Sequence, residues 1–254
     1  MLVYLLAAAC AVGVVLIAAR LLRRGSDDDK PDGPSAGHAG SMISALFLLA
    51  FAVAIVVPWT AADSARLNTH TESRSIAEAA WSAKRLAAAD AARFQAGLAD
   101  YARFVRDSEW PLMADGRLSP DGWARLEKLR RDAQALPTKE GDDEGKDART
   151  ALLDHITAIT TARQQRAMDA RTSPPPGLLV ITALTGLMVI LLPFLAGARP
   201  RGMTLLPLTL MAALLGVGVW LCLDITHVFT GALAVGPDAF NGVLAELHRL
   251  SAGG

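Results

Sequence analysis

Four long apolar runs divide this chain and constrain its fold more than any other feature of the sequence. None of them has Lys, Arg, Asp or Glu in its interior. A helix needs about 20 apolar residues to cross the roughly 30 Å hydrocarbon core of a bilayer. Backbone polar groups in lipid can bond only to one another, so such runs must be helical. The predicted spans are residues 2–19, 42–59, 177–198 and 203–223.

These runs divide the chain into segments of different expected structure. The expected fold class is an all-α membrane protein with four transmembrane helices and a helical extramembrane bundle between spans two and three. Residues 25–40 are predicted to be a flexible linker, because small polar residues with several Pro and Gly bury too little to become ordered. The predicted segments are 1–24 (first span and basic flank), 25–40 (linker), 41–59 (second span), 60–173 (helical extramembrane domain), 174–198 (third span), 199–202 (short basic loop), 203–224 (fourth span) and 225–254 (C-terminal segment).

The extramembrane domain carries the periodicity of amphipathic helices. Residues 60–107 are rich in Ala and nearly free of breakers, so one continuous helix is expected there, ending at Pro111. Ser119-Pro120-Asp121 is typical of a helix start, with a Ser cap and Pro in the first turn. A further helix is expected to run to about Arg171. The apolar stripes predicted to form the core are Phe94, Leu98, Tyr101 and Val105; then Trp123, Leu126, Leu129, Ala133 and Leu136; then Leu152, Ile156 and Ile159.

Arginines beside the spans favour one orientation in the membrane. Arg20, Arg23 and Arg24 follow the first span, and Arg199 and Arg201 lie between the third and fourth. Short basic loops stay in the cytoplasm, which puts both termini and the central domain on the outer side of the membrane. The expected location is therefore a cell membrane, which the chain crosses several times.

Composition and motifs exclude several function classes. The 25 basic residues balance the 25 acidic ones, so no clustered basic surface for nucleic acid is expected. The five histidines are scattered, and the sequence contains no phosphate-binding glycine loop or nucleophile elbow. We therefore expect no enzymatic activity, no cofactor and no metal. The expected partners are the lipid bilayer and further copies of this chain.

Two groups of polar residues in the domain are candidate sites. Glu109, Trp110 and Pro111 end the second predicted helix, where the Trp either caps the core or contacts a membrane or partner. Arg163 and Arg166 lie three residues apart and share a helix face. That face is either a solvated surface or a ring of positive charge near a pore mouth, which would attract anions.

The end of the last apolar run carries a third candidate. Asp224 lies at the edge of the span, where an acid either occupies the interface at little cost or marks a functional site. A short amphipathic helix follows from Pro237 and Asp238, and it could lie on the bilayer or on the central domain. Its apolar face consists of Phe240, Val243, Leu244, Leu247 and Leu250.

These patterns together resemble the bestrophin-like family of bacterial four-span proteins. The resemblance covers most of the chain. It rests on Ala-Arg-Gln-Gln-Arg at 162–166, on Glu-Trp-Pro at 109–111, and on an ending that includes Asp224, Phe229-Thr230-Gly231 and Val-Gly-Pro-Asp-Ala-Phe at 235–240. It makes Phe229 and Gly231 candidate site residues.

The resemblance implies kinship with bestrophins, which are pentameric anion channels whose second span lines the pore. Phe47, Phe51 and Ile55 share one face of span two, and on this view they would form a hydrophobic constriction. The alternative is that they face lipid or neighbouring helices. The resemblance also implies a cytoplasmic central domain, opposite to the orientation that the arginines favour.

Two functions remain open from the sequence. One is an oligomeric channel for anions. The other is a membrane-anchored sensor or scaffold whose helical domain binds a ligand or partner, motivated by helices that run from the spans into the domain.

Overall fold

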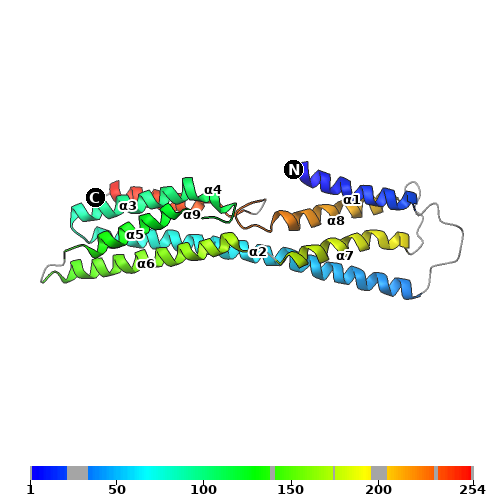
Figure 1. The fold of residues 1–254 in the computed structure, drawn as a ribbon, viewed down its shortest axis with the longest axis horizontal. Helices are drawn as coiled ribbons and strands as arrows, with labels where there is room; N and C mark the ends of the chain where they lie inside the picture. The colour runs from blue at the N-terminus through cyan, green and yellow to red at the C-terminus, as the bar shows by residue number, and fades with distance from the viewer. Residues whose placement is uncertain are drawn as a thin grey trace. The chain divides into compact units, whose positions relative to one another are not determined.

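Helices joined by short turns make up the part of the chain that the computed structural model describes, residues 2–21, 34–137, 141–173, 175–195, 205–231 and 234–252. No strand occurs among these residues, which confirms the predicted all-α class (Figure 1). The elements are α1 (Leu2–Leu21), α2 (Pro34–Lys84), α3 (Ala88–Phe104), a π-helical turn (Val105–Glu109), α4 (Trp110–Met113), α5 (Pro120–Gln134), α6 (Asp143–Arg171), α7 (Pro176–Leu195), α8 (Leu205–Asp224) and α9 (Asp238–Ala252).

The chain forms two compact units. We call Met1–Trp59 with Ser173–Thr226 the apolar unit, and Thr60–Thr172 with His227–Gly254 the helical domain. Helix α2 belongs to both, its first part to the apolar unit and its second to the domain. The linker prediction is wrong for residues 34–40, because α2 already begins at Pro34, a residue that helices tolerate in their first turn. The rest of that linker and the loop at 199–202 lie outside the described residues.

Three helices among the described residues are long and apolar enough to cross a membrane. They are Ser41–Lys84, Gly177–Leu195 and Leu205–Asp224. Helix α1 falls short of this length, since its apolar stretch is Leu5–Ala18. Three of the four predicted spans are therefore helices of spanning length and apolar composition, and the first is not.

Small residues bring α1 and α8 into close contact. A Cβ atom on Gly216 of α8 would lie 2.7 Å from the carbonyl oxygen of Ala7 and 2.8 Å from Cβ of Ala11. Such close backbone approach is typical of helix pairs in lipid, where small residues replace the hydrophobic driving force. Val15, Ala18, Ile190, Phe194 and Ala212 form the buried cluster that joins α1, α7 and α8.

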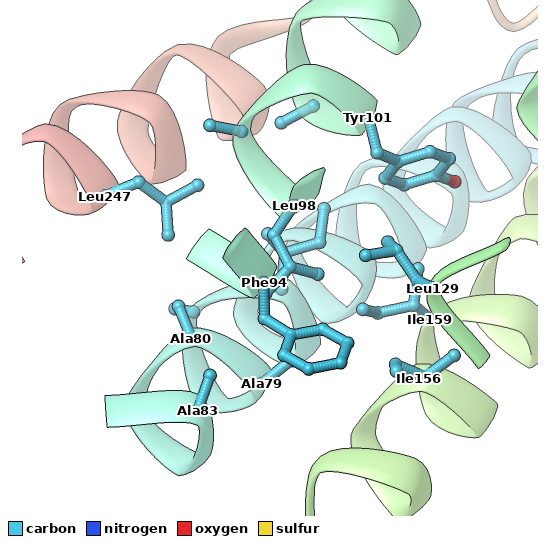
Figure 2. Packing of buried hydrophobic residues seen from close by; sticks show 14 of the residues in the cluster. Ala79, Ala80, Ala83, Phe94, Leu98, Tyr101, Leu129, Ile156, Ile159 and Leu247 are labelled. Carbon is cyan, nitrogen blue, oxygen red and sulfur yellow. The ribbon is translucent and has the colours of Figure 1, made fainter. Parts of the chain in front are cut away.

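The predicted continuous helix over residues 60–107 is wrong, because the chain turns between α2 and α3. The turn is closed by a bond from the backbone N–H of Leu86 to the carbonyl of Ala83, with N and O 3.0 Å apart. Ala83 of α2 and Phe94 and Leu98 of α3 belong to one buried cluster (Figure 2). Folding back lets both helices bury their apolar faces, and this gain overrides the high helix propensity of the sequence.

Pro111 does not end its helix, as the sequence suggested. The chain passes through the π-helical turn Val105–Glu109, and helical structure continues to Met113. The backbone N–H of Trp110 bonds to the carbonyl of Val105, five residues back. A π-helical turn accommodates the missing N–H and the bulk of a proline ring, which an α-helix resists. The chain then reverses at Gly116, whose φ of 67° suits glycine.

The core of the helical domain follows the predicted stripes in most positions. Phe94, Leu98, Tyr101 and Val105 are buried against Leu126 and Leu129 of α5 and against Ile156 and Ile159 of α6 (Figure 2). Trp123 is an exception, with 36% of its surface exposed. The side chain of Ser119 accepts a bond from the N–H of Asp121, 3.2 Å away, so the predicted start of α5 is confirmed. Helix α9 packs against the domain through Phe240, Val243, Leu247 and Leu250.

Candidate functional site

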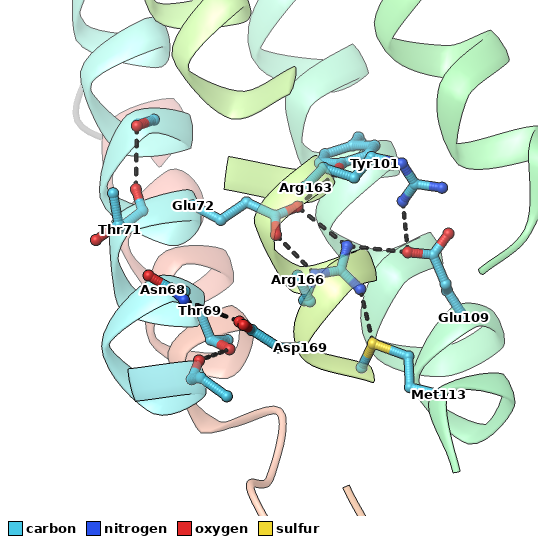
Figure 3. A network of polar contacts seen from close by, with 12 residues as sticks. Asn68, Thr69, Thr71, Glu72, Tyr101, Glu109, Met113, Arg163, Arg166 and Asp169 are labelled. Carbon is cyan, nitrogen blue, oxygen red and sulfur yellow. Dashed lines mark hydrogen bonds and ion pairs between the residues drawn. The ribbon is translucent and has the colours of Figure 1, made fainter. Parts of the chain in front are cut away.

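Four charged side chains meet inside the helical domain, and we call them the charge cluster. They are Glu72 of α2, Glu109 of the π-helical turn, and Arg163 and Arg166 of α6 (Figure 3). All four residues have no exposed surface. Removing charges from water costs several kcal/mol per ion unless each charge is paired and hydrogen-bonded. The stability of the domain therefore depends on how these four charges are paired.

The two arginines and two glutamates are arranged so that their formal charges cancel. Arg166 donates from Nε to Oε2 of Glu72 at 2.7 Å and from Nη2 to Oε1 of the same carboxylate at 3.1 Å. Its Nη2 also lies 2.9 Å from Oε1 of Glu109. Arg163 donates from Nη1 to Oε1 of Glu109 and from Nη2 to the carbonyl of Ser119, the latter at 2.8 Å. Such charge-assisted and bidentate bonds are the strong ones in proteins.

Tyr101 extends the cluster from α3. Its hydroxyl donates to Oε1 of Glu72 over 2.6 Å. Burial raises the pKa of the Tyr101 phenol well above its usual value, and the nearby negative charge of Glu72 raises it further. Burial alone would lower the pKa of Arg166, but the charge and hydrogen bonds of Glu72 outweigh it and raise that pKa on balance. Tyr101 is therefore a neutral donor and Arg166 a permanent cation.

Aromatic rings enclose the cluster. The guanidinium of Arg163 lies 4.9 Å from the centre of the Trp123 ring, which gives this half-exposed Trp its structural role. Arg166 lies 5.6 Å from the ring centre of Phe240. Trp110 packs edge-on against Phe240 and against Phe229, with ring centres 5.8 Å and 5.5 Å apart. Guanidinium groups are attracted to aromatic faces, so these rings stabilise cations that have lost their water.

Gly122 is predicted to be required by the charge cluster. A Cβ atom there would lie 2.4–2.5 Å from the guanidinium atoms of Arg163, which Glu109 and the Ser119 carbonyl hold in place. Gly122→Ala should therefore cost about 1–3 kcal/mol, the usual range for overpacking a core. The check is the thermal unfolding midpoint of the full-length protein, compared with Gly242→Ala, where a Cβ meets nothing within 4 Å. Equal midpoints for the two variants would contradict the packing described above.

The structure decides between the readings of Arg163 and Arg166. A solvated face is wrong for both residues, because both are fully buried. Their positive charge is also compensated by Glu72 and Glu109, which gives a ring of free charge at a pore mouth no support from this geometry. The sequence could not show this burial, because helical spacing indicates that two residues share a face but not which other helices cover that face.

The other residues singled out in the domain lie beside the cluster. Trp110 caps the core rather than projecting from it, and Pro111 follows it in α4. Phe229 is buried in a second cluster with Ala65, Met113 and others. Gly231 has a φ of 85°, in the region that favours glycine, where the chain turns back towards α9. Nearly all motifs behind the family resemblance therefore meet around one buried centre.

Phe47 and Phe51 lie in the apolar unit, in contact with neighbouring helices. A Cβ on Gly186 of α7 would lie 3.1 Å from the ring of Phe47, and one on Gly218 of α8 would lie 2.9 Å from the ring of Phe51. The two rings also stack on each other, with centres 5.5 Å apart. These contacts favour the neighbouring-helix alternative over a pore-lining position. Ile55, one turn further along, is half-buried.

Asp224 is the last residue of α8 and is half-buried. It belongs to the apolar unit, whereas the charge cluster lies in the helical domain.

Sequence reasoning missed Glu72, Tyr101 as a polar group, and Met113. Arg166 also donates from Nη1 to the sulfur of Met113, at 3.1 Å. A usable signal existed for Glu72, which falls at helical spacing among the buried residues Ala65, Thr69, Ile76 and Ala80. An acid on an otherwise apolar helix face must find a buried partner, and the unmatched arginines of α6 were available.

The cluster has the character of a structural centre. Each of its carboxylates is held by at least one arginine, and no group of three or more His, Cys, Asp or Glu side chains that could hold a metal occurs among the described residues. Arginines remain charged at any physiological pH, so the two guanidinium groups are permanent cations in this centre.

Comparison with known proteins gives one match. A family model, the bestrophin-like domain, matches residues 5–240, which is most of the chain. No curated protein and no solved structure matches the chain.

Proposed function

We propose that this chain, which belongs to the bestrophin-like family, is a membrane-anchored sensor or scaffold whose helical domain binds a ligand or partner. The observation that carries the proposal is the complete burial and internal pairing of Arg163 and Arg166. The residues best suited to attract permeating anions are instead used to tie α2, α6 and the π-helical turn together. Because α2 also supplies a span-length apolar helix, a change in the domain could be carried along one helix.

A fourth span is part of this proposal. Helix α1 is 20 residues long and packs closely on α8, a helix that is itself long and apolar enough to span. Leu5, Leu6 and Ile17 leave 60–68% of their surface exposed. In water such surface would be unfavourable, whereas in lipid it costs nothing, so α1 is best placed in the bilayer beside α8.

We further propose that the helical domain lies outside the cytoplasm, following the arginines that flank the predicted spans. A Cys in place of the exposed Lys128, with Cys10 and Cys222 replaced by Ala, should react with a membrane-impermeant maleimide in intact cells. Labelling only after lysis would reverse the orientation and agree with a cytoplasmic domain.

An anion channel is the second candidate, and family membership is the observation that favours it. Bestrophins form pentameric anion channels, and a ring of copies of this chain could enclose an axis. In that case span two would line the axis, with Phe51 and Ile55 near a constriction. Homo-oligomerisation is a requirement of this candidate and not of the sensor.

Chloride efflux from liposomes separates the two candidates. The sensor proposal predicts that liposomes holding purified protein lose chloride no faster than empty liposomes. Phe51→Ala should not raise the rate, because Phe51 fills a space against Gly218 rather than closing a pore by dewetting.

The same reconstituted sample is used for the folding and subunit-number controls. Circular dichroism and mass photometry of the reconstituted sample would establish that the protein is folded and how many subunits it contains. Efflux above the empty-liposome rate, increased by Phe51→Ala and accompanied by a closed ring of subunits, would overturn the sensor proposal in favour of the channel.

A further inference from the structure

A groove runs between α3 and α9 on the helical domain, apart from the charge cluster. Its volume is about 740 Å³. Ligand sites for small molecules usually fall between about 300 and 1,000 Å³. Both helices and the end of α2 belong to one compact unit, so the groove is a feature of a single body. Alanines of α3, leucines of α9 and several basic side chains line it.

The groove exists because α3 presents small side chains to it. Ala88, Ala92, Ala96 and Ala99 recur at spacings of four, four and three, so they form one stripe along the helix. Leucines of α9 form the facing wall. At 1.5 Å per residue the stripe from Ala88 to Ala99 is roughly 16 Å long. This floor is apolar and narrow, and its length suits an extended alkyl chain.

The charges around the groove are of one sign. Lys84, Arg103 and Arg106 line it, and none of its described lining residues is Asp or Glu. Arg106 donates to Asp107 through Nε at 2.6 Å and Nη2 at 2.8 Å, so this cation is already paired. The pKa of the Asp107 carboxyl is lowered, mainly by that hydrogen bond with Arg106 and further by the charges of Arg106 and Arg103.

Arg103 is the cation left available at one end of the alanine stripe. Among the described residues it makes no hydrogen bond or ion pair, and its side chain is exposed. Asp107 carries one negative charge beside two arginines, so a net positive charge remains there. A guanidinium binds a carboxylate through parallel, charge-assisted hydrogen bonds.

We infer that this groove binds a long-chain alkyl carboxylate, with the carboxylate on Arg103 and the chain along the alanine stripe between α3 and the leucines of α9. The assignment rests on the proposed function, since it names the ligand class of the helical domain. Charge complementarity selects an anion, and the length of the apolar floor selects a chain rather than a compact metabolite.

Photo-crosslinking tests this inference without interference from ligand dissolved in the bilayer. Full-length protein in lipid nanodiscs would be irradiated with a dodecanoate that carries a diazirine on its chain, and labelled peptides would be identified by mass spectrometry. We expect label in residues 88–106 or 244–251. Excess dodecanoate should remove it, and excess dodecanol, which has the same chain without the charge, should not.

Three substitutions test which side chains contact the dodecanoate. Arg103→Gln should reduce the label about tenfold, as expected for the loss of one charge-assisted hydrogen bond. Ala96→Leu should also reduce it by filling the stripe. Arg93→Gln is the matched control, because Arg93 is exposed on the same helix, does not line the groove, and should leave the label unchanged. Circular dichroism would confirm that each variant is folded.

Three results would overturn the inference: label confined to the apolar helices, equal competition by dodecanol, or no effect of Arg103→Gln in a folded variant. These outcomes are independent of chloride efflux. A protein that binds dodecanoate and also conducts chloride would refute the sensor proposal and leave the ligand assignment standing.

Discussion

Replacing Arg166 by Met should destabilise the protein more than any other single change considered for the helical domain. The variant keeps an unbranched apolar side chain but leaves the Glu72 carboxylate buried without its bidentate partner. Breaking a buried ion pair in this way typically costs about 3–5 kcal/mol. For a chain of this size the thermal unfolding midpoint should fall by roughly 10 °C. The measurement is thermal unfolding of the full-length protein in a mild detergent.

Two further variants show whether the charge, rather than the packing, is responsible. Arg66→Met breaks an ion pair with Asp63 in which both side chains are 53% exposed, so it should change the midpoint little. The double variant Glu72→Gln with Arg166→Met removes both charges and should recover part of the lost stability, because no uncompensated carboxylate remains. A double variant as unstable as Arg166→Met alone would show that the loss comes from packing.

Leu98→Ala should produce the second largest loss. Leu98 of α3 has no exposed surface and lies in the cluster that joins α2, α3, α5, α6 and α9 (Figure 2). Deleting a large buried side chain costs about 2–5 kcal/mol through lost burial and the cavity that remains. The unfolding midpoint should therefore fall by several degrees.

Arg93→Ala is the matched control for Leu98→Ala, five residues earlier on the same helix. Arg93 is half-exposed, pairs with Asp90 3.0 Å away and lies 5.2 Å from the ring centre of Phe94, so its loss should cost about 1 kcal/mol or less. Similar effects of the two substitutions would mean that the inward face of α3 is assigned incorrectly.

Local sequence determined most of the helices and the residues that face the core. The stripe from Phe94 to Val105 and the Ser119 cap were correct, because helical period and capping chemistry depend only on neighbouring residues. The apolar runs likewise identified the three span-length helices, since length and lack of charge are properties of the segment itself.

The predictions from sequence were wrong at positions where contacts between residues distant in the chain determine the structure. No residue type near Arg85 marks the turn between α2 and α3; the turn exists because both helices bury faces in one core. Pro111 continues a helix because a π-helical turn accommodates it, and Trp123 contacts the guanidinium of Arg163 instead of the apolar core.

The charge cluster depended most on tertiary structure. Arg163 and Arg166 were recognisable from the sequence as a pair on one face, and Glu109 as part of a motif. Only the fold brings Glu72, 94 residues away from Arg166, to within 2.7 Å of it and so changes a solvated face into a buried centre. A charged residue is stable inside a protein only with its partner in place, and the identity of that partner is set by helix packing rather than by spacing along the chain.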